Sequence, residues 1–174
     1  MHTETDFPVR IAGPEDEGEL LRLCLAMLDE ECLRDFNGKP FVINQEKIRA
    51  TIQKAVQPRR NEPGAGEAWC AVVDASDGIA GSVYLTVQTP YYSDQPYICE
   101  HWNWLHPAHR KSLIGRSLAE FSQAMAEEMQ LALVGGHVWY GDRESPKMRF
   151  FRRMGAKPLG AMYLYTSDVK DEEE

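Results

Sequence analysis

The chain has 174 residues, of which 43% are hydrophobic and 26% are charged, and its formal net charge is −8. This length suits one domain with a core that needs neither disulfides nor metals, and the composition excludes wholesale disorder. The acidic balance argues against a nucleic-acid partner, because binding to the phosphate backbone requires clustered Lys and Arg. Residues 168–174 carry five acids and one Lys, which is half of the net charge, so we predict a single domain over residues 1–167 and a flexible acidic tail.

The cysteines and the hydropathy pattern indicate a compartment. The chain shows no signal-peptide pattern and no apolar run of the roughly 20 residues that span a bilayer, so we expect a cytoplasmic protein without membrane association. Cys24, Cys32, Cys70 and Cys99 lie in apolar stretches without metal-ligand spacing, which is typical of buried reduced thiols. We expect no metal site.

The first half of the chain predicts one strand and two helices. Residues 7–11 form a short strand candidate, and Pro14 with the acids that follow it begins a helix whose apolar residues recur at helical spacing. Residues 44–56 predict a second helix, with Asn44 as its N-cap.

The second half alternates strands and helices. Residues 68–73 and 79–87 are β-prone runs separated by turn residues, which predicts a hairpin, and residues 97–105 predict a further strand. The remaining predicted elements are a helix at 116–131, a strand at 134–140, a short helix at 145–154 and a strand at 159–165. One hairpin among alternating units indicates a single α/β or α+β domain with a mixed sheet.

Residues 97–121 predict a strand, a basic turn and a helix. A helix N-terminus presents unpaired N–H groups and a positive dipole, which together favour an anion. His109, Arg110, Lys111 and Arg116 add positive charge to this turn in an otherwise acidic chain. We therefore expect a phosphate or diphosphate ligand here, although the glycines are too few for a Walker P-loop or a GxGxxG fingerprint.

The order of three segments resembles the GNAT superfamily of acyl-CoA N-acyltransferases. The segments are Pro14-Glu15-Asp16, the strand–turn–helix just described, and Phe150-Phe-Arg-Arg-Met-Gly155-Ala, and the resemblance extends from Val9 to Tyr165. The run Trp102-Asn-Trp-Leu-His-Pro-Ala-His-Arg110 is also similar to a phage-associated branch of that superfamily.

The resemblance implies a cofactor site. In this family a Gln/Arg-x-x-Gly-x-Gly/Ala motif wraps the coenzyme A diphosphate, and Arg110-Lys-Ser-Leu113-Ile-Gly115 stands in its place. Arg110 and Gly115 match the motif, whereas Leu113 replaces its first glycine and its side chain obstructs a close approach of backbone to phosphate. The implied diphosphate-binding residues are Arg110, Lys111, Ser112, Leu113, Ile114, Gly115 and Arg116. The pantetheine would pair near Trp104, Leu105 and His106, where a backbone N–H would polarise the thioester carbonyl.

The resemblance also implies a fold and a reaction. The fold is a mixed, mostly antiparallel central sheet of about six to seven strands flanked by about four helices. The reaction is N-acetyl transfer from acetyl-coenzyme A to a primary amine, either a small molecule or a peptide, by direct attack and without a metal. The acceptor pocket would be built from loops at 36–42 and 89–96, and the sequence determines neither the acceptor nor whether the chain forms a homodimer.

Two residues are candidates for the general base. Strict strand alternation places Cys99, His101, Asn103 and Leu105 on one face and Glu100, Trp102 and Trp104 on the other. In several GNAT amine acetyltransferases the base lies on the side of residues 99 and 101, and imidazole titrates near working pH, so His101 comes first. A hydrogen-bonded structural histidine is the competing interpretation of His101, and Glu100 is the alternative base if a bulge shifts the register.

The general acid is less well defined. The family places a Tyr four residues before the Gly of the last helix, and here that position is Phe151, which has no proton to give. Tyr140, Tyr163 or Tyr165 would substitute, or the thiolate leaves unassisted because its pKa is moderate. Leu113 and Phe151 motivate an alternative function, a catalytically weak or inactive GNAT-like module that binds coenzyme A or a protein partner. A third hypothesis is a nucleotide-binding α/β protein, which would share the anion-binding turn, but the sequence lacks the glycine fingerprint of that class.

Overall fold

The computed structural model of the chain describes residues 7–35, 43–57, 67–135 and 146–157. The chain forms two compact units, one through His137 and one from Val138, and each is described by itself. The predicted single domain over residues 1–167 and the tail at 168–174 stay predictions.

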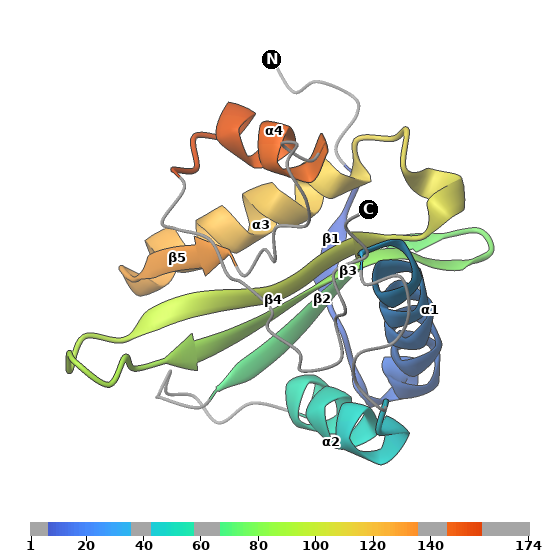
Figure 1. The fold of residues 1–174 in the computed structure, drawn as a ribbon, viewed down its shortest axis with the longest axis horizontal. Coiled ribbons are helices and arrows are strands. Elements are labelled where there is room, and N and C mark those ends of the chain that lie inside the picture. Colours follow the sequence, from blue (N-terminus) through green and yellow to red (C-terminus); the bar gives the residue numbers. More distant parts are fainter. Residues whose placement is uncertain (1–6, 36–42, 58–66, 136–145, 158–174) are drawn as a thin grey trace, which may run out of the picture. The chain divides into compact units, whose positions relative to one another are not determined.

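The first unit is built on a mixed sheet whose described part has five strands. They are β1 (Val9–Ile11), β2 (Ala68–Ala75), β3 (Gly78–Gln88), β4 (Tyr97–Leu105) and β5 (Ala132–Gly135). The strands lie in sequence order across the sheet (Figure 1), with β1 to β4 antiparallel and β5 parallel to β4. The expected count of six to seven strands is higher than the five found, and the strand predicted at 159–165 lies outside the described residues.

The four described α-helices agree with the sequence pattern. They are α1 (Glu17–Asp35), α2 (Gln45–Val56), α3 (Ile114–Met129) and, in the second unit, α4 (Pro146–Arg153), with 3₁₀ turns at Pro14–Asp16 and Pro107–His109. The side chain of Asn44 accepts a hydrogen bond from the N–H of Lys47 at 3.0 Å, which confirms the predicted N-cap. None of the helices in the described ranges is long and apolar enough to cross a membrane.

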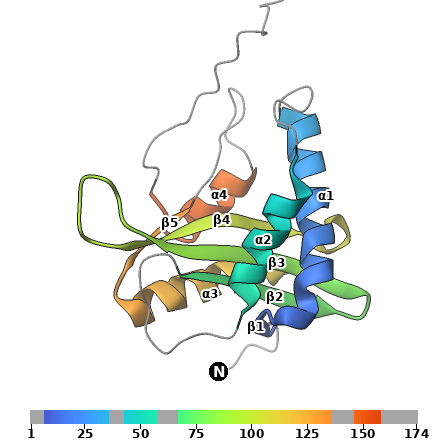
Figure 2. The same ribbon diagram turned by 90° about the horizontal axis from the view of Figure 1, so that it is seen from below.

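The sheet of the first unit has a helical layer on each face. Helices α1 and α2 cover one face and α3 covers the other (Figures 1 and 2). The α1/α2 face encloses a core that includes Leu20, Leu23, Ile52, Val72 and Trp104. The α3 face encloses a second core that includes Trp69, Val83, Leu85, Ile98 and Leu118. Because helices cover both faces, β3 is buried along most of its length, on both sides of the sheet.

A β-bulge interrupts the pairing of β3 with β4. Tyr84 lies opposite Trp102, while the next residue, Leu85, lies opposite Glu100, so His101 is the extra residue of the bulge. The bulge places two consecutive residues on the same side of the sheet, since the rings of both His101 and Trp102 stack on Tyr84 of the α1/α2 core.

The predicted division of β4 between two faces is therefore wrong beyond the bulge. Leu105 packs in the α3-side core, and Asn103 shares that side because it lies directly opposite Val83. Trp104 belongs to the α1/α2 core instead. Strict alternation was expected to keep Asn103 and Leu105 with His101, and one inserted residue reverses that relation.

The second unit contributes α4. The rings of Phe150 and Phe151 meet edge to face with centroids 5.2 Å apart. The helix ends at Gly155, whose φ of 89° lies in the left-handed region, and the N–H groups of Gly155 and Ala156 bond back to the carbonyls of Arg152 and Phe151. The glycine is required by this helix end.

Candidate functional site

The site begins at an edge of β4 that is only partly paired. In the described residues β5 pairs with Tyr97–Glu100 and no further. The N–H of His106 donates to the carbonyl of Ala80 at 2.9 Å, so alternate residues of this antiparallel ladder direct their N–H groups toward β3. The N–H groups of Asn103 and Leu105 consequently face the other edge. Three positions were expected to supply an N–H that polarises the thioester. The N–H of Leu105 points away from β3 toward the open edge, whereas the N–H groups of Trp104 and His106 point toward β3.

The turn after β4 exposes several backbone donors at the start of α3. Among the described residues, none accepts a hydrogen bond from the N–H of Lys111, Leu113 or Gly115. The Ser112 hydroxyl donates to the carbonyl of His109 at 2.6 Å and accepts from the N–H of Ile114 at 3.3 Å, which fixes the shape of the turn. Open N–H groups before and at the first turn of a 16-residue helix are an arrangement that suits an anion.

Gly115 is needed for close packing at this point. A Cβ added to Gly115 would lie 3.2 Å from Cδ1 of Leu105, so the glycine lets the start of α3 approach the end of β4. Leu113 is 45% exposed at the N-cap of α3 and makes no side-chain cap. Its side chain stands beside the open amides, where the resembling family has a glycine.

Arg110 does not face these amides. Its guanidinium forms two hydrogen bonds with the carboxylate of Glu30 on α1, one of them at 2.7 Å, and its Nε donates to the carbonyl of Leu105 at 3.4 Å. The same guanidinium lies 5.4 Å from the ring centroid of Trp104, within the range of a cation–π contact. Arg110 therefore ties the turn to α1, and its predicted role in holding a diphosphate stays a prediction.

The other two cationic candidates differ in their surroundings. Arg116 pairs with Glu120 on its own helix at 2.7 Å, with both side chains exposed. Lys111 is exposed, and no described carboxylate pairs with it. Lys111 is thus the cation of this turn that the described structure leaves for a ligand.

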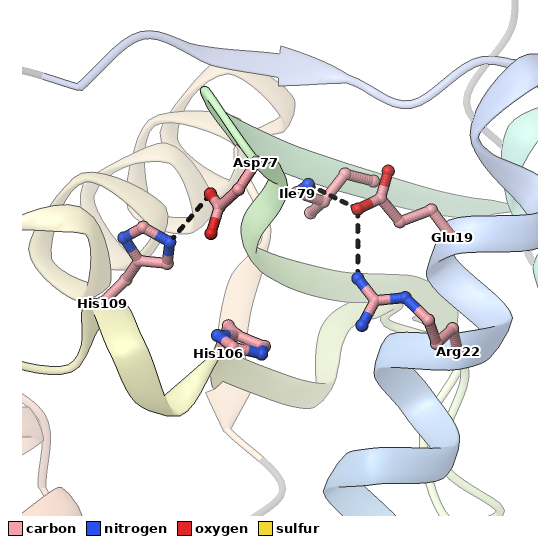
Figure 3. Close-up of a pocket in the computed structure, with 6 residues that line it drawn as sticks. All are labelled: Glu19, Arg22, Asp77, Ile79, His106 and His109. Carbon is pink, nitrogen blue, oxygen red and sulfur yellow. Dashed lines mark hydrogen bonds and ion pairs between the residues drawn. The ribbon is translucent and has the colours of Figure 1, made fainter.

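His106 and His109 line a separate polar pocket of about 470 Å³ (Figure 3). Its lining residues come from α1, the β2–β3 hairpin and the turn after β4: Glu19, Arg22, Asp77, Ile79, His106 and His109. Nε2 of His109 lies 3.3 Å from a carboxylate oxygen of Asp77, and Glu19 accepts from the N–H of Ile79 and from Arg22 at 2.8 and 3.2 Å. Sequence reasoning missed this pocket because its residues are far apart in the chain and form no motif.

His101 sits at the bulge with a defined set of polar partners. Its Nε2 lies 2.8 Å from Oγ1 of Thr86 and 3.3 Å from Nε2 of Gln88. Burial lowers the pKa of His101 below its ordinary value, so the imidazole is neutral near pH 7. A neutral imidazole is the protonation state that a general base requires.

Glu100 lies on the opposite face of the sheet. Its side chain is 2% exposed, and one carboxylate oxygen accepts from the hydroxyl of Ser122 on α3 at 3.3 Å. The two candidate bases therefore cannot serve the same substrate atom from the same side. Exposure and protonation state favour His101, which leaves Glu100 in a buried polar cluster under α3.

Other polar residues near β4, and the proposed general acid, differ in what the structure describes of them. Burial, and then the nearby charge of Glu100, raise the pKa of Cys99, which favours the protonated thiol. The amide nitrogen of Asn103 is buried without a hydrogen-bond partner in the described part of the chain. Tyr140, proposed as general acid, lies outside the described residues. Within the described ranges, no three His, Cys, Asp or Glu side chains gather in a way that would hold a metal ion.

Comparisons with known proteins show what this fold is similar to. No family model and no curated protein matches the chain. Among solved structures, an aminoglycoside acetyltransferase from an uncultured soil metagenomic sample, in complex with sisomicin, matches with a TM-score of 0.60 and 16% identity over 91% of this chain and 95% of that chain. Ribosomal-protein-alanine N-acetyltransferase from Brucella melitensis biovar Abortus 2308 matches with a TM-score of 0.58 and 15% identity over 91% and 99%. A probable acetyltransferase matches with a TM-score of 0.65 and 15% identity over 95% of this chain and 99% of that chain.

Two of these structures are acetyltransferases and the third is a probable acetyltransferase, and this chain shares their fold. At such identities the likeness shows the fold alone. The resemblance to a phage-associated branch stays a prediction.

Proposed function

We propose that this chain is an N-acetyltransferase that moves an acetyl group from acetyl-coenzyme A to a primary amine. One observation carries the proposal: the open amides at the start of α3 adjoin the part of the β4 edge that no described strand pairs, in a fold shared with acetyltransferases. The amides suit a diphosphate and the strand edge suits an extended amide-containing chain. Coenzyme A contains both parts in one molecule.

The residues at the turn fit the diphosphate. The N–H groups of Lys111, Leu113 and Gly115 supply directed donors, and the side chains of Lys111 and Arg116 supply charge. Ser112 and Ile114 hold the turn in shape through the hydroxyl of Ser112. Arg110 acts indirectly, by fixing the turn to α1 through Glu30.

The edge of β4 fits the pantetheine. An extended chain that adds to a strand edge bonds to the backbone groups facing it, here those of Asn103 and Leu105. The side-chain amide of Asn103 is buried on the α3 side of the strand, without a hydrogen-bond partner among the described residues, so only the backbone of Asn103 is assigned to the pantetheine. Trp104 and His106 support the edge through their packing and through the bond from His106 to Ala80.

Bound acetyl-coenzyme A supplies an activated acetyl group as a thioester. The attacking amine would form a C–N bond to the acetyl carbon as the C–S bond breaks and coenzyme A leaves as its thiolate, and the amine would give up one proton. His101 is the proposed acceptor of that proton, because it is neutral and exposed on the α1/α2 face. The acceptor amine would approach from this face while coenzyme A lies at the edge of β4 and the N-terminus of α3. The net charge of −8 favours a cationic acceptor.

Titration calorimetry of the full chain with acetyl-coenzyme A tests the donor site. We expect Lys111→Glu to weaken binding by about tenfold, the effect of roughly 1.4 kcal/mol, because the charge beside the diphosphate is reversed. Lys47→Glu is the matched control, since it makes the same charge change on an exposed residue of α2. The absence of binding by the wild-type chain at millimolar concentration would disprove the donor assignment.

Turnover is tested separately, by release of free thiol over a panel of amines. Acetyl-coenzyme A binding without turnover on any amine would favour the alternative function, a coenzyme A-binding module without catalysis. Leu113 and Phe151 are the observations that favour this alternative, since neither offers what the resembling family has at its position.

A further inference from the structure

A chain of hydrogen bonds on β3 and β4 leads to His101. The hydroxyl of Tyr97 lies 3.0 Å from Oε1 of Gln88, and Nε2 of Gln88 lies 3.2 Å from Oγ1 of Thr86. Oγ1 of Thr86 then lies 2.8 Å from Nε2 of His101. The series therefore runs from Tyr97 at the start of β4, through two side chains of β3, to one ring nitrogen of the bulge residue.

The register and the bulge bring these four side chains together. Thr86 and Gln88 are two residues apart on β3, so they project from the same face of the sheet. Tyr97 lies directly opposite Gln88 in the register. The bulge turns His101 toward the same face, where its ring also stacks on Tyr84 with centroids 5.1 Å apart.

The direction of the series follows from its first bond. A carbonyl oxygen only accepts, so the Tyr97 hydroxyl donates to Oε1 and thereby orients the Gln88 amide. The amide nitrogen, which only donates, is then directed toward Thr86 and also lies 3.3 Å from Nε2 of His101. A hydrogen on Nε2 would bring two donors into the same space. The Thr86 hydroxyl, which accepts from Gln88, is free to donate its own hydrogen to Nε2.

We propose that Thr86, Gln88 and Tyr97 are positioning residues that hold His101 as the neutral tautomer with its hydrogen on Nδ1 and its lone pair on Nε2. The lone pair is directed at the Thr86 hydroxyl, and Nδ1 has no partner among the described residues. The role of this arrangement in the reaction rests on the proposed function. Its existence does not.

The arrangement specifies how a proton would reach His101. The amine proton passes to Oγ1 of Thr86 as the hydroxyl hydrogen of Thr86 passes to Nε2, so one O–H bond forms as another breaks. The threonine is unchanged at the end, and the imidazole becomes an imidazolium with a hydrogen on each nitrogen. Thr86 has the acceptor capacity for this, because it accepts one bond from Gln88 and retains a second lone pair.

NMR of the imidazole nitrogens in the free, full-length wild-type chain tests the tautomer directly. A His101→Gln variant identifies the signals. We expect a pyrrole-like Nδ1 and a pyridine-like Nε2 at a pH above the His101 transition. The opposite pattern, with the hydrogen on Nε2, would overturn the proposal.

The direction in which the pKa of His101 changes in Thr86 variants provides a second test of the tautomer. Bonds donated to Nε2 stabilise the neutral ring, so Thr86→Val should raise the pKa of His101 by about half a unit. If instead Nε2–H donated to Thr86, the lost bond would have favoured the charged ring, and the same variant would lower the pKa. Thr86→Ser keeps the hydroxyl and should restore the wild-type value. Gln88→Glu should raise the pKa further, because a carboxylate replaces the donor.

The other titratable groups around His101 would not cause the expected rise in its pKa in Thr86→Val. Burial raises the pKa values of Tyr84 and Cys99, so both are neutral near pH 7, and Glu100 points to the other face. A cooperative thermal unfolding transition in Thr86→Val would show that the variant folds. The measurement requires no substrate, so a failed tautomer test and a failed acetyl-coenzyme A titration refute different statements.

Discussion

The Arg110→Ala variant separates a structural role of this residue from a ligand-binding role. Arg110 matches a motif position that would hold a diphosphate, yet its guanidinium is engaged by Glu30, by the carbonyl of Leu105 and by the face of Trp104. If this engagement is its function, removing the side chain loosens the turn and leaves the open amides in place. We therefore expect a loss of stability with little loss of coenzyme A affinity.

The magnitude follows from the exposure of the pair. The side chains of Arg110 and Glu30 are 39% and 29% exposed, so solvent screens the ion pair and its contribution lies near the upper end of surface pairs, about 1 kcal/mol. The contact with the Trp104 ring adds roughly 0.5–1 kcal/mol. A total of about 1.5–2 kcal/mol corresponds to a decrease in Tm of roughly 3–8 °C for a chain of this size.

Arg116→Ala is the matched comparison. Its i,i+4 pair with Glu120 is exposed on both sides and contributes about 0.3–0.5 kcal/mol, so Tm should change by less than about 2 °C. Affinity for coenzyme A should fall by about tenfold, since a charge beside the phosphates is lost. Differential scanning calorimetry and titration calorimetry on both variants give the two readouts. An Arg110→Ala protein with unchanged Tm and a tenfold loss of affinity would refute the structural role.

Three further predictions concern the scaffold and the turn. Asp16→Asn should lower the free energy of unfolding in urea by about 2–3 kcal/mol at pH 7, because the buried carboxylate accepts hydrogen bonds from Arg10 at 2.7 and 2.9 Å. That guanidinium lowers the pKa of Asp16, so the difference between variant and wild type should shrink as the pH falls below about 4. Asp74→Asn, at an exposed partner of Arg10, is the control and should cost less than about 1 kcal/mol. Gly81→Ala should destabilise by about 1–3 kcal/mol, because its Cβ would lie 2.5 Å from the leucine that ends β4 and 3.1 Å from a carbonyl oxygen. Leu113→Gly should tighten coenzyme A binding in calorimetry, and unchanged affinity would show that the exposed leucine does not obstruct the amides.

The sequence was sufficient for elements whose signals are local. The Asn44 cap, the Gly78 turn between β2 and β3 and the boundaries of β4 all depend on neighbouring residues and are found where predicted. The predicted start of α3 is residue 116, whereas the helix begins at Ile114, whose N–H bonds to the hydroxyl of Ser112 at 3.3 Å. Helix ends often differ from a sequence pattern by one or two residues, because their terminal turns fray.

The functional residues were predicted less completely, because a sequence shows charge but not the partner of a charge. His109 and Arg110 belong to the basic run, yet the fold places Asp77 beside one and Glu30 beside the other. Both carboxylates come from segments far away in the chain. The proposed anion site consists mainly of backbone N–H groups, which leave no trace in residue identity.

The bulge at His101 explains why a one-residue feature decides the chemistry of the site. Strict alternation would have placed His101 and Glu100 on opposite faces, as found, but would also have placed Asn103 and Leu105 beside the histidine. With the extra residue, the α3 side of β4 carries Glu100, Asn103 and Leu105 together, while His101 remains with Thr86 and Gln88. In the proposed site, the amine thus approaches the edge of β4 on the face that carries His101. Removing the bulge by deletion of His101 should therefore abolish amine acetylation in the thiol-release assay while leaving calorimetric binding of acetyl-coenzyme A measurable; loss of both in a folded deletion variant would show that the two faces are not independent.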